Sequence, residues 1–281
     1  MELSDIIFGN KLSVTERAEF DAYIANRFEA AGELPKGSMD FLELWDNIIL
    51  YTGLFGAAKA INMKVCPKRP VEFRSPELIE IKMYDSFAGR IPIIYVRDPD
   101  DFEQLVTNAA YRGVRPEGLE KTGASFISGK TTRFIILSAK PYSNVSASEL
   151  GLDTNIDWSE KSLLLRREHE CTHYFTKQTY GIANNILHDE IMADFIGIYE
   201  VFGFYRADWF LRFMGIIEGS GDRLKFYTES LSPMVSEAVT ELLKEAAYRL
   251  EEWSETEGFK ALSKEDRIKT MCKKGLAGMI R

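Results

Sequence analysis

The sequence is poor in cysteine and histidine, with three of each in 281 residues. The cysteines, Cys66, Cys171 and Cys272, are odd in number and far apart, and no two form a C-x-x-C pair. This pattern excludes a disulfide framework and is typical of a reducing compartment. The first residues also lack a basic segment followed by an apolar core, so no signal peptide is indicated. We therefore expect a cytoplasmic protein.

The chain also lacks an excess of positive charge and a long uncharged stretch. Lys and Arg number 35 against 43 Asp and Glu, which gives a net charge of −8 and a pI near 5.2. A nucleic-acid protein needs a basic face, so no nucleic-acid partner is expected. The most apolar long segment, 194–218, is interrupted by Glu200, Arg206, Asp208 and Arg212 and is too charged to span a bilayer. No membrane partner is expected, and the oligomeric state is left open.

Length and patterning predict an α+β protein with two lobes. Residues 1–70 are predicted to be a helical N-terminal region, which starts with a capping box at Ser13 and Glu16. Residues 71–180 are predicted to form an α+β lobe, and residues 181–281 a helical C-terminal lobe. The predicted strands of the middle lobe are 78–84, 91–96, 124–128 and 133–138. The later predicted helices are 99–112, 159–179, 186–202, 205–217, 232–256 and 263–279.

All three histidines fall within twenty residues, and two of them form the pattern H-E-x-x-H. His169 and His173 are four residues apart in a predicted helix, so both imidazoles lie on one face and can reach one metal ion. Glu170, one step round the helix, would lie beside the open coordination position. There it could take a proton from an attacking water and pass it to a leaving group.

A third ligand is predicted in the next helix. Glu190 and Asp194 lie one turn apart on one face of it. Glu190 would complete a His₂Glu set, and Asp194 could accept a hydrogen bond from the far ring nitrogen of His169. His188 is the alternative third ligand, but it is about 200° from Glu190 on the helix and no carboxylate follows on its face. Glu190 is the preferred assignment.

These two segments resemble the active site of the gluzincin metallopeptidases, especially the thermolysin-like branch. In that branch an H-E-x-T-H helix is followed by a short loop and a helix with E-x-x-x-D and then glycine. The matching residues here are His169, Glu170, Thr172, His173, Glu190, Asp194 and Gly197. The resemblance implies a zincin-like fold and a zinc ion held by His169, His173 and Glu190. It also implies Glu170 as general base, Asp194 behind the ligands, and a peptide or protein as substrate.

The sequence offers several candidates for the group that would stabilise the oxyanion. No histidine follows His188, so the downstream histidine of such enzymes has no counterpart. Tyr180, after the active helix, is the candidate, because thermolysin-like enzymes carry a cleft tyrosine near that place. Weaker candidates, chosen only for their downstream location, are Tyr205, Arg206, Arg212 and Tyr227. Segment 123–128 lies where zincins place the edge strand of the cleft, although it could equally be an ordinary strand.

Other interpretations of the motif require residues that this chain lacks. A metzincin would have glycine and histidine where this chain has Thr176 and Thr179. A di-iron bundle would need a second E-x-x-H, which the chain lacks. Two further hypotheses remain open: a metal-binding regulatory or interaction protein with little proteolytic activity, and a helical protein in which the motif is coincidental.

Overall fold

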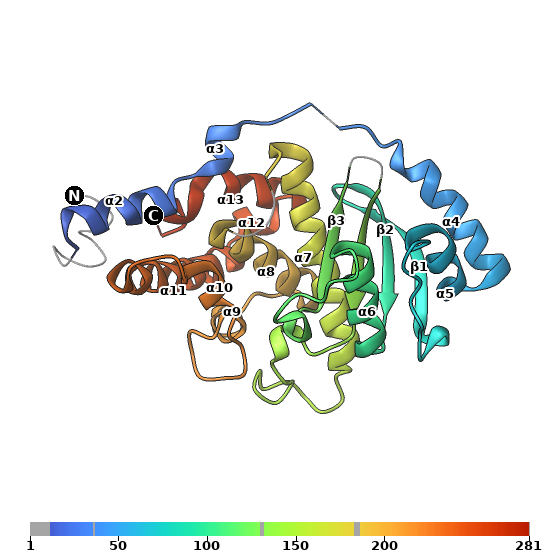
Figure 1. Cartoon of the computed structure of the whole chain (residues 1–281). Coiled ribbons are helices and arrows are strands. Elements are labelled where there is room, and N and C mark those ends of the chain that lie inside the picture. Colours follow the sequence, from blue (N-terminus) through green and yellow to red (C-terminus); the bar gives the residue numbers. More distant parts are fainter. Residues whose placement is uncertain (1–11, 36, 130–131, 183–185, 281) are drawn as a thin grey trace. The chain divides into compact units, whose positions relative to one another are not determined.

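The computed structural model describes residues 12–35, 37–129, 132–182 and 186–280. The chain divides into two compact units (Figure 1). One unit consists of residues 37–170. The other combines residues up to 36 with residues 171–281. Together they give a mixed α+β structure, as predicted, with one four-stranded sheet among the described residues.

The sheet belongs to the unit of residues 37–170 and has the strand order β1-β2-β4-β3. Its strands are β1 (Ile79–Ser86), β2 (Gly89–Val96), β3 (Ala124–Ser128) and β4 (Arg133–Ser138). β1 and β2 form an antiparallel hairpin, β2 runs parallel to β4, and β3 pairs antiparallel with β4. All four predicted strands are confirmed, and β3 lies at an edge of the sheet.

Three helices supply most of the apolar core on one face of this sheet. They are α4 (Phe41–Phe55), α5 (Ala57–Ala60) and α6 (Pro99–Ala110). Helix α6 begins at Asp98, whose carboxylate accepts hydrogen bonds from the first free backbone N–H groups. The core joins Trp45 and Ile48 of α4 to Ile94 and Ile136 of the sheet. Alternation along each strand places these isoleucines on the same face, which fixes the register of the sheet.

The other unit is helical in the part of the chain that the structure describes. Its helices are α2 (Val14–Ile24), α3 (Arg27–Ala31), α8 (Leu187–Phe202), α9 (Ala207–Met214), α10 (Leu224–Thr228), α11 (Pro233–Glu255), α12 (Glu257–Lys260) and α13 (Lys264–Gly278). Helix α8 is buried on every side from Leu187 to Ile198. Such a helix must lie at the centre of a core, because its apolar residues are not confined to one stripe.

The N-terminal 70 residues do not form the single helical region that was predicted. Helices α2 and α3 pack on α11 and α13, whereas α4 and α5 pack on the sheet. The first helix also breaks at Asn26, which caps α3 and donates through Nδ2 to the carbonyl oxygens of Cys272 and Lys273 on α13. A contact with a segment this distant in the chain leaves no signal in local periodicity. The short helices α10 and α12 were not predicted either.

The structure bears on two sequence expectations, which concern bilayer-spanning segments and the cysteines. No helix among the described residues has the length and apolar character that a bilayer-spanning segment requires. The three cysteines are buried, and none is in a disulfide. Burial raises the pKa of the Cys66 thiol to about 11, which keeps it in the unreactive protonated form.

Candidate metal site

Helix α7 (Trp158–Tyr180) carries the H-E-x-x-H segment and continues across the division between the two units. Asp157 precedes it and accepts a hydrogen bond from the backbone N–H of Glu160 at 3.0 Å, as an N-cap does. His169 and His173 lie one turn apart on this helix and are both buried. Glu170, between them in sequence, is partly exposed. The helix therefore presents the two imidazoles on one face, as predicted.

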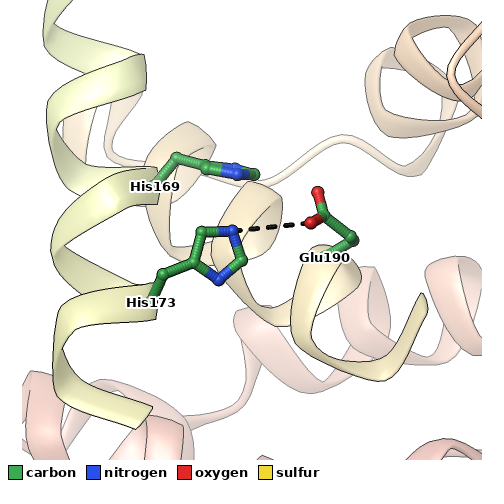
Figure 2. A group of neighbouring side chains, drawn as sticks. All are labelled: His169, His173 and Glu190. Atoms are coloured by element: carbon green, nitrogen blue, oxygen red, sulfur yellow. Dashed lines mark ion pairs between the residues drawn. The ribbon is translucent and has the colours of Figure 1, made fainter. Parts of the chain in front are cut away.

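Glu190 of α8 completes the group. One ligand atom from each of His169, His173 and Glu190 lies within 4.8 Å of the others, and all three side chains are buried (Figure 2). His173 Nε2 is 3.5 Å from Glu190 Oε1. Glu190 belongs to the first turn of α8, where the helix dipole favours a negative charge. The three predicted ligands therefore converge.

Asp189 supports His173 from behind. Its Oδ2 atom lies 2.6 Å from Nδ1 of His173, and Asp189 is fully buried. A carboxylate accepts, so Nδ1 carries a proton, and Nε2 is the ring atom directed toward Glu190. The donor set, the spacing and this carboxylate–histidine pair fit a divalent transition metal.

Tyr142 supports His169 from the loop after β4. Its hydroxyl oxygen lies 2.9 Å from Nδ1 of His169. The loop is fastened to α7 at two points. Ser162 accepts a hydrogen bond from the Tyr142 backbone N–H, and the buried guanidinium of Arg166 donates to the carbonyl oxygens of Ser138, Lys140 and Pro141. A metal bound through Nε2 of His169 would leave the contact with Tyr142 in place.

Glycine at position 123 makes the Arg166 contact possible. A Cβ atom there would come within 2.1 Å of Nε of Arg166. Any larger residue would displace the guanidinium and, with it, the loop that carries Tyr142.

We predict that Tyr142→Phe weakens zinc binding about tenfold while the protein stays folded, because outer partners of ligating histidines contribute about 10- to 100-fold to metal affinity. The measurement is a competitive zinc titration. Tyr84→Phe is the matched control, since it removes a hydroxyl that donates to Glu168 of the same helix at 2.8 Å. Equal zinc affinity in the two variants would contradict the role given to Tyr142.

Arg223, the residue before α10, lies against the carboxylates of α8. Its Nη2 atom is 2.5 Å from Glu190 Oε2, and its Nη1 atom is 2.9 Å from Asp194 Oδ2. The guanidinium thus orients Glu190 through one oxygen while the other faces His173. Asp194 is fully buried and takes part in this pair, and its predicted hydrogen bond to His169 stays a prediction.

Tyr227 of α10 is the candidate tyrosine that the structure brings to the ligands. Burial, followed by the charge of Glu190, raises the pKa of the Tyr227 hydroxyl. The hydroxyl is therefore a proton donor at neutral pH. In the sequence, Tyr227 is a candidate only because of its downstream location. No sequence feature identified Tyr142, Asp189 or Arg223 as part of the site.

The other sequence candidates lie in different surroundings. Tyr180 is the last residue of α7, and its ring packs edge-on against Phe28 with centroids 5.4 Å apart. Burial and the neighbouring Cys272 raise its pKa. Tyr205 is buried, Arg206 pairs with Glu251, and Arg212 donates to the Glu218 carbonyl. These contacts give Tyr180 a packing role, and its catalytic role stays a prediction without structural support.

His188 is buried away from the three-residue group. Its Nε2 atom lies 3.0 Å from the carbonyl oxygen of Met271, and its ring packs edge-on against Phe28. Burial lowers its pKa from 6.5 to about 4. His188 is therefore a neutral core residue, and the preference for Glu190 as the third group agrees with this placement.

We predict that the free energy of unfolding decreases at acidic pH because of His188. Its folded pKa lies below its unfolded pKa, so the unfolded chain binds the proton more tightly. The stabilisation is complete above about pH 6.5 and declines as the pH falls toward 4, by about 2 kcal/mol between about pH 7 and pH 5. Urea unfolding of metal-free protein measures the loss. The His188→Gln variant should lack this contribution to the pH dependence of stability. A pH dependence equal to that of the wild type would contradict the prediction.

A protein-family model matches the chain over residues 56–133 and 130–279. The chain belongs to this family. It is described as a "Family of unknown function (DUF7005)". No curated protein and no solved structure matches the chain. Membership of DUF7005 therefore assigns no chemistry, and the argument for a function depends on the site itself.

Proposed function

We propose that this DUF7005 protein is a zinc-dependent hydrolase with a zincin-like fold that cleaves peptide bonds. The observation that carries the proposal is the buried group of His169, His173 and Glu190, whose ligand atoms lie within 4.8 Å of one another. Two imidazoles and one carboxylate are the protein ligands of several catalytic zinc sites, which keep a fourth position for water or substrate. The resemblance to the gluzincin motif supports the same assignment.

The residues around the group have defined roles in this proposal. A bound zinc ion would polarise the scissile carbonyl and lower the pKa of the attacking water. Glu170 takes the proton from that water as its oxygen adds to the carbonyl carbon, and gives it to the amine nitrogen as the C–N bond breaks. Asp189 and Tyr142 hold the two histidine rings, and Arg223 orients Glu190.

The proposal gives the oxyanion to Tyr227 instead of Tyr180. The Tyr227 hydroxyl is protonated at neutral pH and lies beside Glu190, whereas Tyr180 packs on Phe28. A fixed donor of this kind stabilises the charge that develops on the carbonyl oxygen. We also propose a cytoplasmic location, which the buried cysteines outside any disulfide support.

Hydrolysis of a peptide library by zinc-loaded protein tests the function. We expect cleavage that stops on chelation and returns when zinc is added back. A second candidate function, a metal-binding regulatory protein, is favoured by one observation, the lack of any histidine after His188 to assist the oxyanion. Stoichiometric zinc without turnover of any library member would reject the hydrolase and leave this second function.

A further inference from the structure

The segment around the end of α4 has an unusual composition for this acidic protein. Between Asp46 and Glu72 the chain contains no acidic residue, although its net charge is −8. The four basic residues in this interval are Lys59, Lys64, Lys68 and Arg69. All four are exposed. Positive charge is therefore concentrated here, within the unit of residues 37–170.

Large apolar side chains project from the same segment. Leu50 is 65% exposed and Leu54 is 68% exposed, while Phe55 and Met63 are 48% and 44% exposed. Helix α4 buries Ile48 in the core, and Leu50 lies about 200° round the helix from it. Leu54 follows Leu50 by one turn, so the two leucines share the face directed away from the core. We call these four residues, together with Lys59 and Lys64, the α4–η1 patch, because they belong to α4, α5 and η1 (Ile61–Val65).

The apolar and basic parts of the α4–η1 patch are in direct contact. The Lys59 ammonium lies 5.0 Å from the centre of the Phe55 ring, and the Lys64 ammonium lies 4.2 Å from the centre of the Tyr51 ring. The two rings are 5.5 Å apart. Two cations therefore lie over a pair of packed aromatic rings at the end of α4.

We propose that the α4–η1 patch docks the protein on the surface of an anionic lipid bilayer. Exposed Leu and Phe next to Lys are the composition of segments that lie in the membrane interface, with the apolar side chains inserted and the cations at the anionic headgroups. Peripheral docking of this kind needs no bilayer-spanning helix.

The shape and charge of the patch favour a bilayer over other occupants. Leucines that are two-thirds exposed stand out from the surface, which suits a planar membrane and not a peptide that needs a groove. A second copy of the chain would set the lysines of one patch against those of the other across a two-fold contact. Nucleic acid would pair with the lysines but would leave the exposed aliphatic side chains in water.

Vesicle flotation of the full-length protein tests the proposal. We expect binding to phosphatidylcholine vesicles that contain phosphatidylserine, little binding to pure phosphatidylcholine, and weakening with added salt. Two double variants, Leu50→Gln with Leu54→Gln and Lys59→Glu with Lys64→Glu, should each lower the partition coefficient by about tenfold or more. The substituted side chains are exposed, so circular dichroism should stay that of the wild type.

Matched control variants make similar substitutions outside the patch, so they show whether the position of the substitution determines the loss of binding. Val114→Gln removes an apolar side chain that is 73% exposed elsewhere in the same unit. Lys82→Glu with Lys260→Glu makes the same change in net charge outside the patch, and both lysines are more than half exposed. These variants should bind anionic vesicles as the wild type does, apart from a small uniform effect of net charge.

Three outcomes would overturn the proposal. The folded wild type could fail to bind anionic vesicles. The controls could lose as much binding as the patch variants. The variant with Leu50→Gln and Leu54→Gln could bind vesicles as well as the wild type while added heparin abolishes that binding. This result would mean that the patch recognises polyanions and not a membrane.

Discussion

Glu170→Gln is expected to slow peptide hydrolysis strongly while leaving the zinc content unchanged. The amide is similar in size to the carboxylate, but it cannot accept and return a proton. General acid–base catalysis contributes about 10²- to 10⁴-fold, so turnover should fall by that amount. Glu170 is partly exposed and outside the group of His169, His173 and Glu190, which is why its loss should spare the metal.

The measurement pairs elemental analysis with a turnover assay on the same preparation. Glu160→Gln is the matched control, because Glu160 lies on the same helix and pairs with Arg97 at the surface. The control should keep both zinc and turnover. If Glu170→Gln kept full turnover, Glu170 would not be the general base, and if it lost the metal, the ligand assignment would need to include it.

Glu190→Ala is expected to weaken zinc binding by more than about 100-fold, because it removes one of three protein ligands and their outer partners alone contribute about 10- to 100-fold. It also removes one partner of Arg223, which keeps its pair with Asp194. A competitive zinc titration gives the affinity, and thermal unfolding of the metal-free protein checks that the fold survives.

Two further variants separate metal binding from folding. Glu190→Gln retains an oxygen that can accept from Arg223, so it should fold as well as the wild type and still bind zinc weakly. Glu200→Gln changes a carboxylate on the same helix that pairs with Lys264 and should leave zinc affinity unchanged. Wild-type zinc affinity in Glu190→Ala would remove Glu190 from the site.

The grouping of His169 and His173 could be predicted from the sequence because helix geometry determines it. His169 and His173 share a face at a spacing of four residues on any α-helix. The partners of the ligands could not be predicted in this way. Tyr142 approaches His169 from a loop that Ser162 and Arg166 fasten to α7, and its position depends on tertiary contacts.

The roles of Arg223 and Asp189 could not be predicted from the sequence either, for two different reasons. Arg223 lies before a five-residue helix that no local pattern predicted, yet it contacts both carboxylates of the E-x-x-x-D motif. Asp189 directly precedes Glu190 in the sequence, but adjacent residues point about 100° apart around a helix. The position of Glu190 therefore does not predict what Asp189 contacts. Because His173 lies on a different helix, which side of α8 faces it depends on how the two helices pack. The strands and longer helices followed from periodicity, whereas the partition of residues 1–70 between two units did not.

The most direct test of the central claim is the zinc content of the purified protein. Elemental analysis after zinc reconstitution and removal of unbound metal should give about one zinc per chain. The same treatment of a His169→Ala, His173→Ala double variant should give none. A wild-type protein that holds no transition metal, or a double variant that holds as much as the wild type, would contradict the assignment of His169, His173 and Glu190 as a metal site.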